Sequence, residues 1–555
     1  MNYTVLKQIY CDKFQINGKP RGPINFKEGL NVVLGGESGT NSIGKSTFLM
    51  ILDFVFGGKD YVKKDTDVQK NVGSHIIKFI FEFNNQEYYF SRSTKNFLSV
   101  NVCNEKFEPQ KDKQMTLEEY LGFLAKNYGL NLPGLSFRNA VGRFIRVYNR
   151  QTINEKRPLQ NATQEAGKQQ VYGLLKLFNK YASIEEREIA AEKAEKAYSV
   201  FKNASQYKYV PIVSSKKQYD KNVSEIARLE EQLKELETKN NEGTLNIDDM
   251  QASRLRDIMS NLSKLRERRN LYLNRLSVID DNEKSGPKKL ETNYKELKKF
   301  FPDVDMEMIR KVDGFHQQIT NILENEFSEE KKSLNNKIKD IDYFISSLNS
   351  EAQKINNQQA PNIQTALLNE YADKMAKLNQ LKNENKNYNE KLRLNNDKQS
   401  QQNVLRSTVN TELKEVESSL NKKMADLNTE ICGSNSFQPP HIELGPKQYS
   451  YETINDQGTG TSYKGLILFD QACLELTALP FFIHDSLLFS NIEVNRKNKI
   501  IKMYSNETKQ IFIAIDTTDL LSPDVQHIIE EHSVLRLERG GKELFGRSWN
   551  EQRSS

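Results

Sequence analysis

The chain has few cysteines and few hydrophobic residues, and no apolar segment long enough to cross a membrane. Its 555 residues include four cysteines, none in a CxxC pair, so neither a zinc site nor a disulfide framework is suggested. Cysteines of this kind are typical of a reducing cytosol. The first residues lack the apolar stretch of a signal peptide, and the apolar run 48–56 is too short for a bilayer. We therefore expect a cytoplasmic protein without membrane contact.

The composition is also too polar for one large globular core. Hydrophobic residues make up 37% of the chain and charged residues 28%, which suits a protein with long solvated helices. The length allows more than one domain at about 150 residues each. The net charge of +6, from 80 basic and 74 acidic residues, is compatible with nucleic acid but does not argue for it.

Residues 39–47, GTNSIGKST, fit the Walker A or P-loop pattern GxxxxGK[ST]. An apolar run at 31–34 precedes them and a helix-like run at 48–52 follows, which is the strand, loop and helix context that the motif needs. Backbone N–H groups in such a loop cradle triphosphate oxygens at the positive end of the helix. Lys45 is predicted to reach the β- and γ-phosphates, and the Ser46 hydroxyl to hold Mg²⁺. The alternative is an ordinary glycine turn before a helix. The predicted nucleotide-binding residues of this loop are Gly39, Asn41, Gly44, Lys45, Ser46 and Thr47.

The two ends of the chain read as mixed strand and helix. Strands are predicted at 77–83 and 87–91 with a turn at 84–86. A short helix is predicted over 116–127, with Thr116 and Glu119 forming a capping box. Near the other end, the pattern predicts a helix over 465–476, buried strands over 480–485 and 510–516, and a strand and turn over 533–541.

The middle of the chain carries narrow apolar stripes at alternating spacings of three and four. Such stripes are typical of coiled coils, although separate amphipathic helices in a bundle are the alternative. Breakers at 240–243, 285–287, 301–303 and 360–361 interrupt the pattern. We expect the chain to run out along one helical arm, turn near 286–316 and return along another. The stripes include Ile226, Leu229, Leu233 and Leu236; Leu255, Ile258, Leu262 and Leu265; Leu334, Ile338, Ile341, Ile345 and Leu348; and Leu368, Tyr371, Met375 and Leu378.

A P-loop near one end and an apolar strand closing on Asp485 near the other indicate an ATPase head split by a helical insertion. The expected parts are 1–180, the N-terminal half of the head; 181–432, the coiled-coil arms; and 433–555, the C-terminal half of the head. In this layout, and in the run 29–35 that leads into the P-loop, the chain resembles the SMC-like ABC ATPases (structural maintenance of chromosomes and related repair ATPases). The resemblance implies an α/β ABC-type P-loop ATPase head split by a long antiparallel α-helical coiled-coil insertion.

The C-terminal portion further resembles a domain of unknown function found at the end of bacterial SMC-like ATPases. The matching runs are 480–489 and 535–541, together with 313–316 near the expected apex. Members of that group often occur in multi-component bacterial anti-phage operons, including ABC three-component systems.

The resemblance assigns roles to residues outside the P-loop. It implies that Asp485 is the Walker B carboxylate that positions Mg²⁺ through water, rather than a surface residue at the end of a strand. Gln151, after the run 144–150, corresponds to the Q-loop glutamine that contacts Mg²⁺ or the attacking water; a surface glutamine is the alternative. The loop with Gly458, Gly460 and Ser462 corresponds to the signature loop, or is a flexible loop with Ser462 as an ordinary N-cap. If this loop acts on the nucleotide of a second head, a homodimer is the simplest assembly.

Two departures from the family pattern bear on hydrolysis. Ser486 follows Asp485 where the superfamily usually has its catalytic glutamate, and Asp516 is followed by two threonines where a switch histidine is usual. His484 and Glu493 are the neighbouring candidates for the missing role. Because positioning and charge neutralisation dominate phosphoryl transfer, such a site is expected to hydrolyse ATP slowly.

A run of basic residues has two interpretations. Arg143, Arg146 and Arg150 recur at helix-like spacing, with Arg138, Lys156 and Arg157 close by. They are either a patch for the DNA backbone, without sequence readout, or a solvated segment or contacts to carboxylates of the head. A helix here conflicts with the strand that the Gln151 assignment needs.

The expected function is an ATP- and Mg²⁺-dependent homodimer whose heads close on ATP and separate on hydrolysis. The arms would transmit that change to DNA or to effector and accessory proteins of the same operon. By resemblance the setting is anti-phage defence, with DNA repair as the next choice. The alternative is a nucleotide-switched scaffold or sensor with little hydrolysis, which Ser486 favours. A P-loop kinase with an unrelated coil is a third reading, against which the split layout counts.

Overall fold

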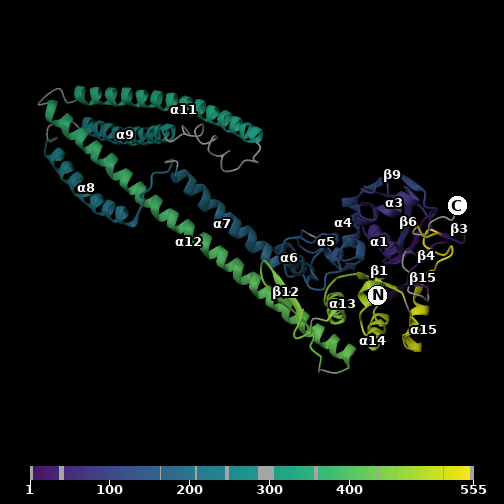
Figure 1. Cartoon of the computed structure of the whole chain (residues 1–555). Coiled ribbons are helices and arrows are strands. Elements are labelled where there is room, and N and C mark those ends of the chain that lie inside the picture. The colour runs from purple at the N-terminus through teal and green to yellow at the C-terminus, as the bar shows by residue number, and fades with distance from the viewer. Residues whose placement is uncertain are drawn as a thin grey trace. The chain divides into compact units, whose positions relative to one another are not determined.

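The computed structural model describes residues 4–36, 43–162, 164–206, 209–243, 249–284, 306–355, 361–433, 437–456, 458–516 and 518–549. The chain divides into two compact units (Figure 1). The first, called the head below, combines Met1–Glu188 with Val404–Ser555, and the second, called the helical unit, is Ile189–Asn403. The head therefore contains both ends of the chain.

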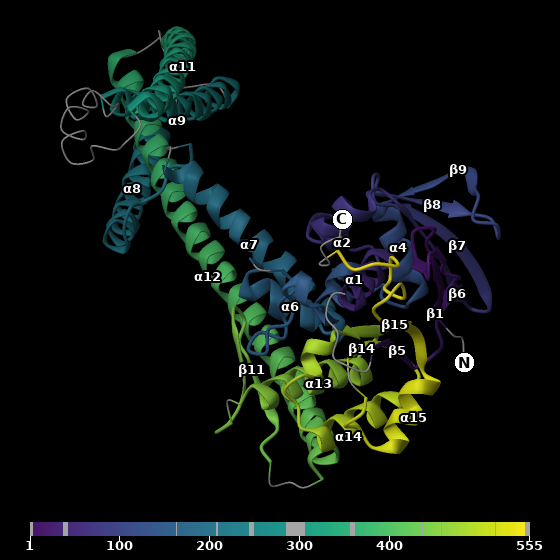
Figure 2. The same cartoon turned by 45° about the vertical axis from the view of Figure 1, so that its right-hand side comes forward.

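A five-stranded parallel sheet joins the two halves of the head. Its strand order is β10-β13-β14-β5-β15, and every neighbouring pair is parallel. The N-terminal strand β5 thus lies between two strands from the other end of the chain (Figure 2). All residues of β5 and β14 are buried, as expected for strands covered on both faces. The strands are β5 (Leu30–Gly35), β10 (Ile145–Arg146), β13 (Phe481–His484), β14 (Gln510–Ile515) and β15 (Ser533–Leu537).

A second, antiparallel sheet belongs entirely to the N-terminal part. Its order is β4-β1-β6-β7-β8-β9, and the predicted hairpin turns at Asn84 and Asn85, which both have positive φ. Small hairpins complete the β structure: β2 (Gln15–Ile16) with β3 (Lys19–Pro20), and β11 (Pro440–Leu444) with β12 (Tyr449–Thr453). The antiparallel sheet of the N-terminal part comprises β1 (Thr4–Tyr10), β4 (Ile24–Asn25), β6 (Ile76–Phe83), β7 (Gln86–Ser93), β8 (Ser99–Cys103) and β9 (Pro109–Thr116).

Helix α1 (Lys45–Val55) forms the centre of the head core. Its sequence is apolar on nearly every side, which is typical of a helix enclosed by other elements. Phe48 packs on Phe26, and Phe56, just after the helix, stacks on Phe481 of β13 with ring centroids 3.8 Å apart. Burying each such side chain contributes about 1.5–3 kcal/mol. The helix after the P-loop is therefore fixed by both halves of the chain.

The other head helices surround this core. Helix α4 begins with the predicted capping box, in which Glu119 N–H donates to Thr116 Oγ1 and Thr116 N–H donates to Glu119 Oε2. The remaining helices and 3₁₀ turns are α2 (Asp60–Lys63), α3 (Thr66–Val72), α4 (Leu117–Asn127), α5 (Phe137–Val141), η1 (Gly142–Phe144), η2 (Tyr148–Arg150), α6 (Gly167–Leu177), α13 (Thr459–Leu476), η3 (Ser486–Phe489), α14 (Val494–Ser505) and α15 (Pro523–Glu531).

The helical unit is built from antiparallel helices. Leu229 and Leu233 of α8 pack on Leu378 and Leu381 of α12, in the predicted coiled-coil manner. Helices α9, α11 and α12 form a small bundle, because Ile258 and Leu262 of α9 share one apolar cluster with residues of α11 and α12. Its helices are α7 (Ala182–Gln206), α8 (Lys216–Gly243), α9 (Asp249–Lys284), α11 (Met306–Ile355) and α12 (Pro361–Cys432), of which α7 and α12 continue into the head.

Two of the predicted breaks coincide with helix ends, since α8 ends at Gly243 and α12 begins at Pro361. Of the predicted apex, residues 286–305 lie outside the described residues, and 306–316 belong to α11. The C-terminal part of α12 belongs to the head, because Val416, Leu420 and Met424 are buried in the head core. The boundary between the units accordingly falls near residue 404 rather than at 432. Among the described residues, no helix combines the length and apolar content that a membrane crossing needs.

Candidate nucleotide-binding site

Three adjacent strands of the parallel sheet end at one edge, and each is followed by residues of the candidate site. β5 leads into the P-loop, β14 into Asp516 and β13 into Asp485. Their ends are level, since Ile515 pairs with Leu34 and His484 with Ile513. The carboxyl edge of a parallel sheet is the usual ligand-binding edge of α/β folds.

The P-loop motif ends in the first turn of α1, which begins at Lys45. Gly44 has φ +102° and is the N-cap of the helix, and a Cβ there would lie 2.6 Å from Cβ of Leu544. Both facts require glycine at this position. Thr47 engages Asp65, whose pKa burial raises to about 6 while the hydrogen bond from Thr47 opposes that rise. Gly39 and Asn41, also predicted for this loop, lie outside the described residues.

Ser46 and Asp485 meet although 439 residues separate them. The Ser46 hydroxyl donates to Asp485 Oδ1 at 3.1 Å. The same carboxylate accepts two backbone hydrogen bonds: the N–H of Ser486 donates to Oδ1 at 2.8 Å, and the N–H of Tyr148 donates to Oδ2 at 3.2 Å. Burial raises the pKa of Asp485 above its usual value, and these three donors oppose the rise. A hydroxyl and a carboxylate are oxygen ligands of the kind that Mg²⁺ prefers, so this pair fits the cation.

Lys45 forms an ion pair that sequence reasoning did not predict. Its Nζ lies 2.5 Å from Oδ1 of Asp516, and the lysine side chain is 7% exposed. The pair passes over Gly35, where a Cβ would lie 3.1 Å from Lys45 Nζ and 3.4 Å from Asp516 Oδ1. The ammonium group of Lys45, which is predicted to bind the triphosphate, is therefore paired with the carboxylate of Asp516 in this structure.

Gln151 lies beside this edge. It follows β10 and η2, has φ +59°, and lines a cavity of about 670 Å³ together with Tyr148, Tyr463 and Leu487. The backbone N–H of Tyr148 donates to Asp485, and Leu487 follows Asp485 closely in the chain, so this cavity lies next to Asp485. The segment contains a two-residue strand between 3₁₀ turns, so the conflict between strand and helix resolves in favour of the strand.

The arginines of this segment do not form a DNA-facing patch, and that interpretation is wrong for Arg143, Arg146 and Arg150. All three are buried. Arg143 donates to Leu159 O at 2.7 Å, and Arg150 donates to the carbonyl oxygens of Gly142 and Ile145 and pairs with Asp60. The arginines instead hold the loop around Gln151 to the head, which is the alternative that the sequence left open.

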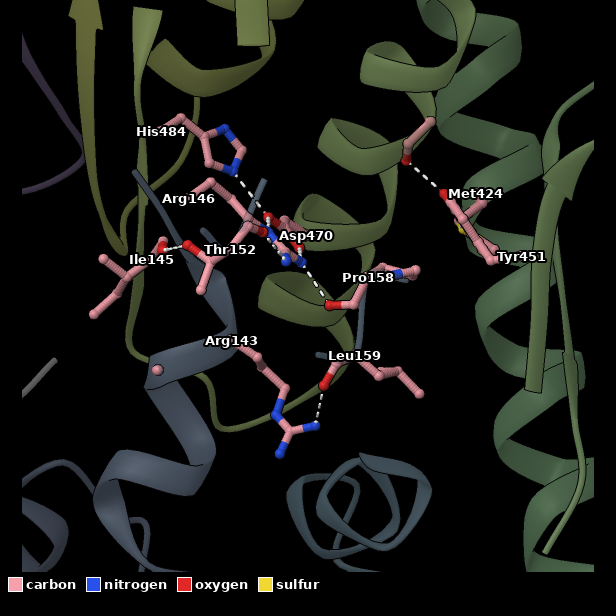
Figure 3. Close-up of polar contacts among 12 residues, drawn as sticks. Arg143, Ile145, Arg146, Thr152, Pro158, Leu159, Met424, Tyr451, Asp470 and His484 are labelled. Atoms are coloured by element: carbon pink, nitrogen blue, oxygen red, sulfur yellow. Dashed lines mark hydrogen bonds and ion pairs between the residues drawn. The ribbon is translucent and has the colours of Figure 1, made fainter. Parts of the chain in front are cut away.

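Arg146 is the centre of a buried ionic cluster (Figure 3). Its guanidinium binds Asp470 of α13 with two hydrogen bonds, at 2.8 and 2.7 Å, and also donates to Pro158 O. His484 shares the same carboxylate through Nε2 at 3.0 Å, and its Nδ1 contacts Tyr504 Oη. Burial alone would raise the pKa of Asp470, but the charge of Arg146 holds it below its usual value. The cluster links α13 to the strands that precede Gln151 and Asp485.

His484 is therefore misplaced as a catalytic candidate. Successive strand residues point to opposite faces of a sheet, so His484 faces α13 and α14 whereas Asp485 faces Ser46. The imidazole is fully buried, and burial lowers its pKa. The other candidate, Glu493, is exposed before α14 and pairs with Arg496.

The signature-like loop forms the start of α13, with one correction. The helix begins at Thr459 with Gly458 as N-cap, so Ser462 lies in the first turn and is not a cap. Asp456 instead stabilises the turn before the helix, because its carboxylate accepts from Gly458 N–H at 3.1 Å and from Thr461 Oγ1 at 2.8 Å. Gly460 packs closely, since a Cβ there would lie 2.3 Å from Asn491 O.

The site also depends on a buried carboxylate of α1. Asp53 is fully buried and pairs with Arg138 at 2.6 Å and with Arg150 at 3.6 Å. Burial alone would raise its pKa, but these charges hold it below the usual value. The last turn of α1 is thereby tied to the residue that precedes Gln151.

Gly58→Ala is expected to destabilise the head by about 1–3 kcal/mol, because the new methyl group overpacks a fixed site. A Cβ at Gly58 would lie 1.9 Å from Asp53 Oδ2. The matched control is Gly122→Ala in α4, where a Cβ meets nothing within 4 Å and helix propensity favours alanine by about 1 kcal/mol. Urea unfolding followed by circular dichroism should give opposite signs for the two variants; equal effects would contradict the packing argument.

Comparisons with known proteins add a C-terminal family match and structural likenesses. No curated protein matches the chain. The Smc head domain with a coiled coil and joint from Pyrococcus yayanosii is similar at 14% identity and a TM-score of 0.46, covering 98% of this chain and 96% of that one. An Smc head domain with an extended coiled coil from Pyrococcus furiosus, bound to the C-terminal domain of ScpA, is similar at 11% identity and a TM-score of 0.40, with the same coverage of both chains. Residues 418–549 match the family described as "Uncharacterised protein conserved in bacteria (DUF2326)", so the C-terminal part of the head carries this domain, as the sequence resemblance indicated.

Proposed function

We propose that the protein is an SMC-like ATPase that binds ATP with Mg²⁺ at the carboxyl edge of its parallel sheet. The observation that carries this proposal is the hydrogen bond between Ser46 of the P-loop and Asp485 of the opposite chain end. A glycine turn without a ligand would not need a buried carboxylate and a buried lysine at the same edge.

The residues present can divide the binding work. Lys45 neutralises the β- and γ-phosphates, and the N-terminus of α1 adds backbone N–H groups. Ser46 and Asp485 hold Mg²⁺, which supplies charge stabilisation of the phosphoryl group, and Gln151 approaches the same region from the neighbouring strand. Binding and hydrolysis then follow mainly from positioning and charge neutralisation.

Dimerisation is the second part of the proposal. The N-terminus of α13, where Gly460 and Ser462 lie in the first turn after the N-cap Gly458, would offer the Gly460 N–H group and the Ser462 hydroxyl to the γ-phosphate held by a second head. Two heads then enclose the nucleotide, and hydrolysis releases them. The helices would pass this change to DNA or to effector proteins of the same operon. The resemblance of the C-terminal part to a domain of anti-phage systems supports defence as the setting, with DNA repair as the alternative.

The test is the mass and the phosphate release of the purified protein with ATP and Mg²⁺. We expect light scattering to show a dimer only when nucleotide is present. Lys45→Ala should bind ATP about 10- to 100-fold more weakly, because a charge-assisted contact worth about 1.5–3 kcal/mol is lost. Lys106→Ala, at an exposed turn of the antiparallel sheet, is the control and should behave as wild type. Equal ATP affinity of Lys45→Ala and wild type would refute the site.

Ser486 favours a second function, that of a nucleotide-switched scaffold or sensor. Its hydroxyl lies 3.5 Å from Asp485 Oδ1, in the position where a catalytic glutamate is usual. Steady-state turnover separates the two functions. Firm ATP binding and ATP-dependent dimerisation without phosphate release would favour the sensor.

A further inference from the structure

Asp516 stands at the centre of the candidate site without an assigned role. It follows the strand β14, which lies between the P-loop strand β5 and the Asp485 strand β13. Its Oδ1 atom contacts Lys45 Nζ at 2.5 Å, and its side chain is 31% exposed. Asp516 is thus a carboxylate next to the lysine proposed to reach the terminal phosphates; its Oδ1 atom is buried, and the rest of its side chain is open to solvent.

The other candidates for proton acceptor are less suited than Asp516. Both oxygens of Asp485 accept hydrogen bonds, from Ser46, Ser486 and Tyr148. Ser486 carries a hydroxyl in place of a carboxylate, and His484 points to the opposite face of the sheet. Among the described residues that follow the three central strands, Asp516 is the carboxylate whose partner a nucleotide would take over.

The ion pair itself shows how binding would prepare this group. Lys45 is almost fully buried, so its ammonium needs an anionic partner in every state. Before nucleotide binds, Asp516 supplies that charge. When the phosphates engage Lys45, the carboxylate of Asp516 loses its partner and remains beside the γ-phosphate. Asp516 also lies close enough to Asp485 to affect it: after burial, the negative charge of Asp516 contributes to raising the pKa of Asp485.

We propose that Asp516 is the catalytic base of this ATPase, in place of the glutamate that Ser486 replaces. This inference rests on the proposed function. In the step, the oxygen of a water molecule forms a bond to the γ-phosphorus while the bond from that phosphorus to the β,γ-bridging oxygen breaks. Asp516 accepts one proton from the water, and the bridging electron pair leaves with ADP. The products are ADP and inorganic phosphate, and Asp516 then returns its proton to solvent.

The test is Asp516→Asn in the full chain, measured with two readouts. Phosphate release should fall about 100- to 10,000-fold, the usual contribution of a general base. Binding of the non-hydrolysable analogue AMP-PNP with Mg²⁺, measured by calorimetry, should stay equal or become tighter, because asparagine competes less for Lys45. Asp519→Asn, an exposed carboxylate on the same loop, is the matched control and should leave both readouts unchanged.

Each other outcome overturns the inference. If Asp516→Asn keeps full turnover, the carboxylate is not the base. If AMP-PNP binding disappears together with turnover, Asp516 has a structural role. If wild type binds AMP-PNP but releases no phosphate, no base acts at this site, although the nucleotide site itself stands. Failure of wild type to bind AMP-PNP, by contrast, would refute the proposed function as a whole.

Discussion

Replacing Asp470 by alanine should lower the free energy of unfolding by about 3–5 kcal/mol, because removing one partner of a buried ion pair leaves the other charge uncompensated. The guanidinium of Arg146 would keep its carbonyl partners but lose both of its hydrogen bonds to carboxylate oxygens. The imidazole of His484 would lose its partner at Nε2. Urea unfolding of the full chain, followed by circular dichroism, measures the loss.

Two further variants show whether burial is the cause. Glu538→Ala breaks the exposed pair with Lys542 and should change stability by at most about 1 kcal/mol. Asp470→Asn keeps the size of the side chain but removes its charge, so its stability should lie between those of wild type and Asp470→Ala. If Asp470→Ala cost no more than Glu538→Ala, the cluster would not hold α13 to the sheet.

Asp485→Ala should reduce phosphate release about 1,000-fold. The Mg²⁺ that Asp485 is proposed to position supplies several kcal/mol of charge stabilisation, and about 4 kcal/mol corresponds to three powers of ten in rate. Phosphate release with saturating ATP and Mg²⁺ measures this effect, and the folded state can be checked by the unfolding transition.

Glu493→Gln serves as the control for the acidic residues that follow β13. The glutamate is exposed and pairs with Arg496, so its loss should leave turnover within about fivefold of wild type, because such a surface pair is worth at most about 1 kcal/mol. A large loss for Glu493→Gln with little change for Asp485→Ala would reverse the two assignments and remove the proposed magnesium position.

The parts that could be predicted from sequence are those encoded by neighbouring residues. The strand before the glycine-rich motif and the helix after it follow from contiguous residues, and the strands β13 and β14 appear as short apolar runs that close on a carboxylate. A motif at one end and a matching strand at the other required the chain to double back. The order of the sheet, with β5 between β14 and β15, confirms that requirement.

The parts that could not be predicted depend on partners distant in the chain. Arg146 and Asp470 are 324 residues apart, and a sequence does not show which charges are buried together. The spacing of the three buried arginines looked like a helical face, but the segment is a short strand between 3₁₀ turns. For His484 a signal did exist: a residue directly before Asp485 on a strand must face the other way.

The sheet order also has a consequence during synthesis. Strand β5 leaves the ribosome some 475 residues before β14, so at about 5–20 residues per second it waits roughly half a minute to a minute and a half for its neighbours. Throughout that interval both edges of β5 and the apolar surface of α1 lack the partners supplied by the C-terminal part. A nascent chain of this design therefore exposes these apolar surfaces early, and its nucleotide pocket can assemble only after β13 and β14 have been synthesised.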